Sequence, residues 1–189
     1  MSKKFLTYDS SNSPSEIRQC LDEYLEYLGR MKGEFPSHAL EFAAAAWHWD
    51  GSDPRCPHDA WLESFEMKEE SIEPAGSKRN LLVKAKFLGA YHDGTFTITY
   101  HGVQKYILNK EPLEFPVNMG SGHGDWQLDE VYLDDDNVVV HDIEFSNNGR
   151  WTIYCGDIEY EWFPFGNSES IESGLVPGQS DLPEALGEG

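Results

Sequence analysis

Hydrophobic residues follow a helical spacing near the start of this chain. From Ile17 to Leu28 they recur three or four residues apart. Directly before this stretch, Ser13, Pro14 and Glu16 supply an N-cap residue, a proline suited to the first turn and the acid of a capping box. The pattern predicts a helix that begins after Ser13 and ends at one of the glycines that follow Leu28.

A second helix is predicted to begin at Pro36 or Ser37 and to run to Trp47. It is apolar nearly all round, because the positions 43–46 are all alanine. A helix without a polar face is typical of the interior of a domain. We therefore expect this helix to be buried.

After residue 61 the spacing of apolar residues changes to two, which is typical of strands. Short turns rich in Asp, Asn and Gly join several of the alternating segments. The predicted strands are 61–68, 81–88, 95–101, 104–108, 127–133, 138–145, 151–155 and 158–163. Helices followed by hairpin-connected strands predict an α+β fold: two N-terminal helices within 13–49, packed on a mainly antiparallel, strongly curved β-sheet over 61–163.

The chain is long enough for one domain of ordinary size, which we place at residues 1–165. Residues 166–189 are acidic and rich in Ser, Gly and Pro, and we expect this tail to be poorly ordered. No apolar run approaches the ~20 residues needed to span a bilayer, and the N-terminus does not have the pattern of a signal peptide. The expected location is the cytoplasm, where three widely spaced cysteines remain reduced thiols.

The charge of the chain is strongly acidic and unevenly distributed. There are 34 Asp and Glu against 14 Lys and Arg, a formal net charge of -20, and Arg150 is the only Lys or Arg after Lys110. A surface of one sign repels nucleic acid and anionic membranes and attracts basic proteins. The composition therefore predicts a basic protein partner, with no nucleic acid and no membrane.

Acidic residues alternate with apolar ones on two of the predicted strands. Neighbouring like charges destabilise a sheet, so such rows either serve solubility or are relieved by a basic partner. The candidate partner-binding residues are Asp142, Glu144, Asp157, Glu159 and Glu161. On the second strand the three acids share one face and form a carboxylate ladder.

Candidate catalytic and metal-binding patterns are incomplete. His-Asp pairs occur at 58–59, 92–93 and 141–142, but they lie at predicted strand starts or turns, without further ligands at helical spacing. No nucleophile and base are specified by a motif. We expect no metal ion, no other cofactor and no catalytic residue.

Three stretches resemble a loose group of small acidic bacterial proteins, some of which are immunity proteins of polymorphic toxin systems. They are the segment 58–62, the strand 81–88 and the C-terminal pair 151–155 and 158–162. The resemblance covers about residues 58–163 and leaves the N-terminal helices outside. It implies a cytosolic protein that binds and neutralises a cognate toxin and has no active site of its own.

Three hypotheses about function follow. The first is a non-catalytic acidic binding protein, an immunity or inhibitor protein that neutralises a basic toxin such as a nuclease by presenting carboxylates where substrate phosphates would lie. The second is a metal-dependent hydrolase that uses the His-Asp pairs. The third is a structural or ligand-binding domain whose charge only maintains solubility.

Overall fold

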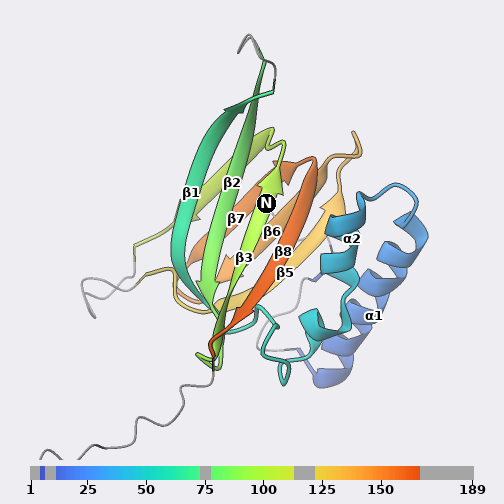
Figure 1. The fold of residues 1–189 in the computed structure, drawn as a ribbon. Coiled ribbons are helices and arrows are strands. Elements are labelled where there is room, and N and C mark those ends of the chain that lie inside the picture. Colours follow the sequence, from blue (N-terminus) through green and yellow to red (C-terminus); the bar gives the residue numbers. More distant parts are fainter. Residues whose placement is uncertain (1–4, 7–11, 73–77, 113–121, 167–189) are drawn as a thin grey trace, which may run out of the picture.

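The structure is a computed structural model that describes residues 5–6, 12–72, 78–112 and 122–166 (Figure 1). Two α-helices and a short 3-10 helix come first: α1 (Pro14–Met31), α2 (Ser37–Ala44) and η1 (Ala46–Trp49). Eight strands follow: β1 (Trp61–Ser71), β2 (Arg79–Leu88), β3 (Gly94–His101), β4 (Lys105–Lys110), β5 (Trp126–Leu133), β6 (Val139–Phe145), β7 (Gly149–Cys155) and β8 (Asp157–Pro164). The α+β class and the N-terminal position of the helices are therefore confirmed. The expected tail lies outside the described residues, apart from Gly166.

The strands form two four-stranded antiparallel sheets instead of one strongly curved sheet. The first, sheet A, has the order β1-β2-β3-β8, and the second, sheet B, has the order β4-β7-β6-β5. The chain passes from sheet A to sheet B between β3 and β4, and returns between β7 and β8 through Gly156 alone. These short crossings place the two sheets in separate layers, and the helices lie beside the β5 and β8 edges (Figure 1).

The helix starts and the turns follow the local sequence signals. The capping box is present, because the Ser13 amide donates to Glu16 Oε2 (2.7 Å) and the Glu16 amide donates to Ser13 Oγ (3.4 Å). Asn137 and Asn148 have φ values of 60° and 56° in their turns, a conformation that Asn tolerates. The second helix is shorter than predicted: Ala45 is extended, so α2 ends at Ala44 and η1 turns away from its axis.

Aromatic side chains fill the space between the two sheets. Phe87 and Phe96 from sheet A meet Trp126, Phe145 and Trp151 from sheet B, with ring centroids 5.0 Å apart for Phe87 and Trp126 and for Phe145 and Trp151. All five are buried. Large rings bury 150–250 Å² each, so this cluster dominates the apolar core.

Helix α1 protects the outer edge of β5 with two tyrosine hydroxyls. Tyr24 accepts a hydrogen bond from the Val131 amide (2.9 Å) and donates one to the Val131 carbonyl oxygen (2.8 Å). Tyr27 accepts one from the Leu133 amide (2.9 Å). An open strand edge is a template for pairing with other chains. The two hydroxyls hydrogen-bond to the backbone groups of β5 with which another strand would otherwise pair.

We predict that Tyr24→Phe destabilises the protein by about 1–3 kcal/mol, because the Val131 amide and carbonyl lose their partner while buried. Urea unfolding followed by tryptophan fluorescence measures the change. Tyr106→Phe is the matched control, since Tyr106 is exposed on β4, and it is expected to leave the stability unchanged within about 0.5 kcal/mol. Equal effects of both substitutions would show that the hydroxyl contacts do not stabilise the edge.

Candidate functional site

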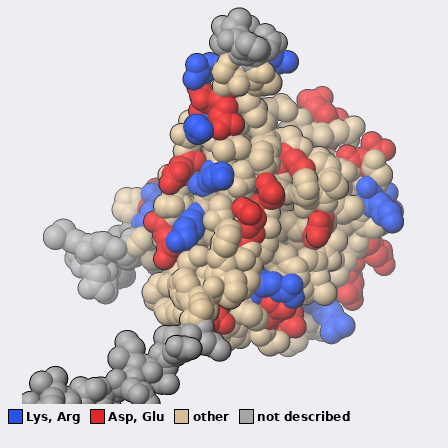
Figure 2. Space-filling model, in the orientation of Figure 1, with Lys and Arg blue, Asp and Glu red and all other residues tan. Residues whose placement is uncertain are grey.

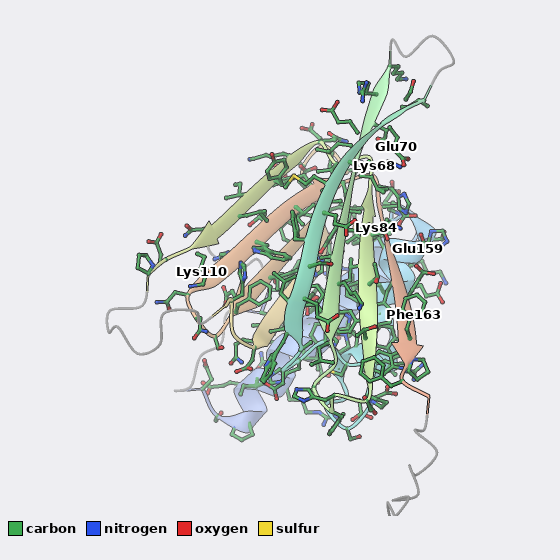
Figure 3. The ribbon with its side chains drawn as sticks, turned by 60° about the vertical axis from the view of Figure 1, so that its left-hand side comes forward. Lys68, Glu70, Lys84, Lys110, Glu159 and Phe163 are labelled. Atoms are coloured by element: carbon green, nitrogen blue, oxygen red, sulfur yellow. The ribbon has the colours of Figure 1, made fainter. Side chains whose placement is uncertain are left out.

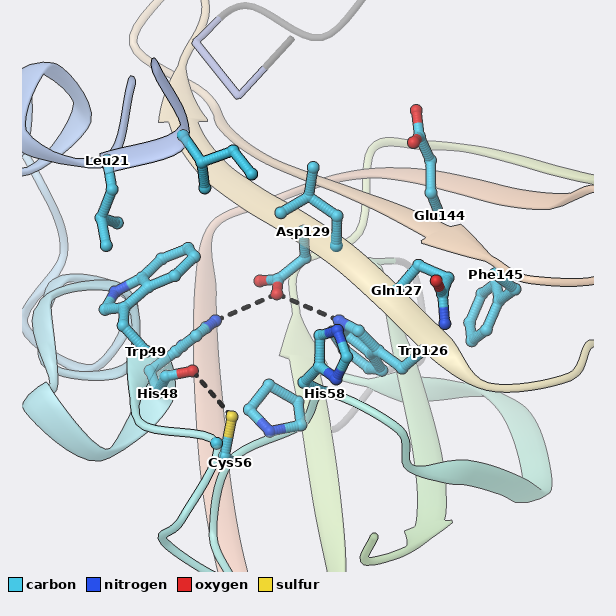
Figure 4. A pocket seen from close by; sticks show the side chains of 14 residues that line it. Leu21, His48, Trp49, Cys56, His58, Trp126, Gln127, Asp129, Glu144 and Phe145 are labelled. Carbon is cyan, nitrogen blue, oxygen red and sulfur yellow. Dashed lines mark hydrogen bonds and ion pairs between the residues drawn. The ribbon is translucent and has the colours of Figure 1, made fainter. Parts of the chain in front are cut away.

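A hollow of about 790 Å³ lies between α1, η1 with its following loop, and the start of β5 (Figure 4). Its walls are mainly apolar and come from Ile17, Leu21, Trp49, Pro57, Leu128 and Phe145. Polar side chains add to the lining: Asp129 and His48 are buried, while His58, Gln127 and Glu144 reach solvent. A partly open apolar pocket with a few polar groups is the usual form of a binding site.

The buried carboxylate of Asp129 accepts three hydrogen bonds beside this hollow. The donors are His48 Nε2 and Trp126 Nε1 to Oδ1, and His141 Nε2 to Oδ2, each at 3.0 Å. A β-bulge between Trp126 and Leu128 makes this possible. Residues three apart in a regular strand point to opposite faces, but the extra residue of the bulge brings Trp126 and Asp129 to the same side.

The hydrogen-bond partners define the protons of this network. His48 Nδ1 lies 3.0 Å from the Phe42 carbonyl oxygen and its Nε2 faces Asp129; because both partners are acceptors, the two contacts are satisfied together when both ring nitrogens carry hydrogen. His141 Nδ1 instead lies 2.9 Å from the Tyr100 hydroxyl, which can donate to it, and the lowered pKa of His141 favours a neutral ring. The floor therefore holds a buried carboxylate with a histidine on each oxygen.

The pKa shifts agree with this assignment. Burial raises the pKa of Asp129, but the charge of His48 and the hydrogen bonds from both histidines outweigh it and hold the pKa far below its ordinary value. Burial lowers the pKa of His141, more than Asp129 raises it. Burial also raises the pKa of Cys56 to about 11, so the thiol is protonated at neutral pH. Its Sγ donates to the His48 carbonyl oxygen (3.1 Å) and ties the loop to η1.

The same bonds decide what chemistry the floor supports. The histidine nitrogens that face Asp129 donate hydrogen to it, so they present no lone pair to a metal ion. In the ranges that the structure describes, no three His, Cys, Asp or Glu side chains converge as a metal site would require. The pairs 58–59 and 92–93 lie exposed outside the strands, and in the pair 141–142 the two side chains point to opposite faces of β6.

The predicted acids of β6 do not both face solvent. Asp142 is buried and accepts two hydrogen bonds from Arg150, at 2.9 Å from Nε and 2.5 Å from Nη2. Glu144 is partly exposed, lines the hollow and lies 3.5 Å from Arg150 Nη1. Asp142 is therefore a structural ion-pair residue and not part of an open acidic face.

Two of the three acids of β8, Asp157 and Glu159, also have partners within the chain. Asp157 caps α2: its Oδ1 accepts from the Ala39 amide and its Oδ2 lies beside His38 Nδ1, both at 2.9 Å. Hydrogen bonding to Asp157 raises the pKa of His38. Glu159 lies 3.2 Å from His101 Nε2, while Glu161 is exposed.

The structure therefore divides the five predicted residues between two sheets. Asp142 and Glu144 lie on sheet B, and Asp157, Glu159 and Glu161 lie on sheet A. Acidic and basic side chains are interspersed over the face on which sheet A lies in front (Figure 2). Two acids of the carboxylate ladder, Asp157 and Glu159, thus lie beside histidines that the strand pattern alone does not bring to them.

The sequence pattern does not reveal the residues at the floor of the hollow. His48 and Asp129 belong to no motif, and their contact spans 81 positions of the chain. For Arg150 the sequence does contain a signal. The turn residues at 147–149 predict a hairpin, and in that hairpin Glu144 faces Arg150 and Asp142 faces Thr152. That register predicts a base beside the two acids of β6.

Comparisons with known proteins do not assign the site. Neither a scan against protein-family models nor a search of curated proteins found a match to this chain. None of the helices in the described ranges is long and apolar enough to cross a membrane. The function must therefore be inferred from the residues of the hollow and from the distribution of charge around it.

We predict that Asp129→Asn destabilises the protein by about 3–5 kcal/mol. The substitution removes the buried anion that holds His48, His141 and Trp126 together and turns an amide donor toward a ring nitrogen that also donates. Urea unfolding at pH 7 measures the loss. Asp135→Asn, in the exposed turn between β5 and β6, is the control and should change stability by less than about 0.5 kcal/mol. A loss no larger than that of the control would disprove the stabilising role of this buried anion.

Proposed function

We propose that this protein is a non-catalytic binding protein for a basic protein partner, acting as an inhibitor in the manner of an immunity protein. The observation that carries the proposal is the hollow beside β5. It offers apolar walls and the Glu144 carboxylate, while Asp129, His48 and His141 at its floor are bonded to one another. Such a site is suited to receiving a basic side chain, because the buried polar groups already bond to one another while Glu144 reaches solvent.

Charge supports a basic partner. The formal net charge of -20 attracts and steers a cationic protein, which raises the rate of association. Apolar side chains such as Leu21, Trp49 and Leu128 would provide the water-excluded contact that holds the complex once it forms. A nuclease toxin fits this description, because an enzyme that binds nucleic acid presents a basic surface.

The proposed place of action is the cytoplasm. Cys20, Cys56 and Cys155 are all free thiols, which supports a reducing compartment. The rival function, a metal-dependent hydrolase, predicts one metal ion per chain after purification without chelator, lost on replacing His58 or His141. Elemental analysis of the wild-type protein separates the two proposals.

We predict that filling or neutralising the hollow weakens binding to the proposed partner. The assay is a titration against the product of the adjacent gene, with Leu21→Trp to occupy the hollow and Glu144→Gln to remove its charge. Leu21→Trp should raise the dissociation rate, since it excludes the anchoring side chain. Glu144→Gln should mainly slow association at low salt.

Asp135→Asn is the matched control for charge, because it removes one carboxylate from an exposed turn. Each variant is first checked for unchanged thermal unfolding. If the hollow variants bind as the control does, the site proposed here is wrong even if the partner is right. If no basic protein binds the wild-type chain, the function itself is wrong.

We predict that the double substitution Glu159→Gln with Glu161→Gln leaves the free protein within about 0.5 kcal/mol of the wild type, since both acids lie on a solvent-facing strand. If β8 also faces the basic partner, association slows at low salt, and the loss shrinks above ~0.15 M salt, where charges more than ~8 Å apart are largely screened. Stopped-flow measurements at two salt concentrations test this. An unchanged rate at low salt would restrict the interface to the hollow.

A further inference from the structure

Strand β4 forms an edge of sheet B and is exposed along its whole length. Its three apolar residues, Tyr106, Ile107 and Leu108, keep 46%, 43% and 39% of their surface exposed. Figure 3 shows the strand, which ends at Lys110, set apart from the helices on the open side of the two sheets. The other edge of the same sheet, β5, is covered by α1. An apolar edge left open is a template for another strand.

The register shows which backbone groups β4 leaves free. The Glu111 amide donates to the Asn148 carbonyl oxygen (3.2 Å), which marks a hydrogen-bonded pair one step beyond the strand. Such pairs alternate along an antiparallel ladder, so Asn109 and Ile107 also bond to β7. The amides and carbonyls of Tyr106 and Leu108 therefore point away from β7, toward the open edge.

The side chains of the same two residues make the edge apolar. Tyr106 and Leu108 pair with Ile153 and Trp151 of the core, so they lie on the inner face of sheet B. Across the gap between the sheets, Met67 of β1 is 42% exposed. If a partner strand paired with β4, every second side chain of that strand would pack against Tyr106, Leu108 and Met67.

Charge distinguishes β4 from the other edges. It carries two lysines, Lys105 and Lys110, and no acid. The edge strands β1, β5 and β8 each contain more acids than bases. Among the edge strands of the described residues, β4 alone has a net positive charge, on a strongly acidic protein, and it matches an extended segment with acidic residues at its ends.

The geometry points to β4 as a strand-addition site for an extended segment of a partner protein, with alternating apolar residues and an acid at each end. This goes beyond the proposed function, which concerns a basic partner at the hollow. A second copy of this chain fits less well. Antiparallel pairing of two β4 strands centred on Ile107 would set Lys105 of each copy opposite Asn109 of the other, so the paired strands would hold four lysines and no acid to offset them.

The test uses the full chain and two synthetic peptides, Glu-Thr-Val-Thr-Val-Glu and its counterpart with Lys at both ends; the six-residue length puts the end residues on opposite faces, as Lys105 and Lys110 are on β4. Binding is measured by fluorescence anisotropy and located by amide hydrogen exchange. We expect the acidic peptide to bind more tightly, although the protein is acidic overall, and to slow exchange of the Tyr106 and Leu108 amides. The charge-swapped variant Lys105→Glu with Lys110→Glu should bind it about fivefold more weakly, because two cross-strand charge pairs are lost.

Leu108→Pro is the second variant. It removes a donor that faces the open edge and leaves the ladder to β7 intact, so it should abolish binding without unfolding the sheet. If this variant does not fold, the charge-swapped variant alone decides. Tighter binding of the lysine peptide, or protection of amides outside β4, would overturn the proposal. Concentration-dependent dimers with β4 protected in the absence of peptide would overturn it in favour of a second copy.

Discussion

The carboxylate of Asp129 receives hydrogen bonds from η1, from β6 and from its own strand, and through His141 it is linked to Tyr100 of sheet A. One buried anion thus joins the helices to both sheets. A buried charge is tolerated only when its partners are complete. The position of η1, and with it the wall of the hollow, therefore depends on this network.

Some acidic residues of the chain bond to groups inside the fold, and others lie on its surface. Asp142 is neutralised by Arg150, Asp157 caps α2, and buried Glu130 accepts from the amides of Phe5 and Leu6. These carboxylates tie together segments that are distant in the chain. They are unavailable to a partner, which leaves residues such as Glu144, at the hollow, to meet basic groups.

Local signals predicted the elements well, whereas contacts between distant residues were out of their reach. The capping box at Ser13 and the period of two in the strands act over a few residues, so the sequence displays them directly. The division into two sheets depends on where the chain crosses from one sheet to the other, and the spacing of apolar residues does not mark these crossings. The single extra residue at the Trp126 bulge inverts which side chains face inward, and so a regular strand pattern does not predict that Asp129 reaches His48.

Sheet B presents surfaces of opposite character at its two edges. The hollow with Glu144 adjoins β5, and the lysine-bearing open edge is β4, three strands away. With neighbouring strands about 4.8 Å apart, the two edges are separated by about 14 Å along the sheet. A single globular partner is wide enough to reach both. If the hollow receives a cationic group and β4 an acid-flanked segment, as proposed, such a partner would need a basic body and an acidic extended arm. Two separate partners would each need only one of these properties.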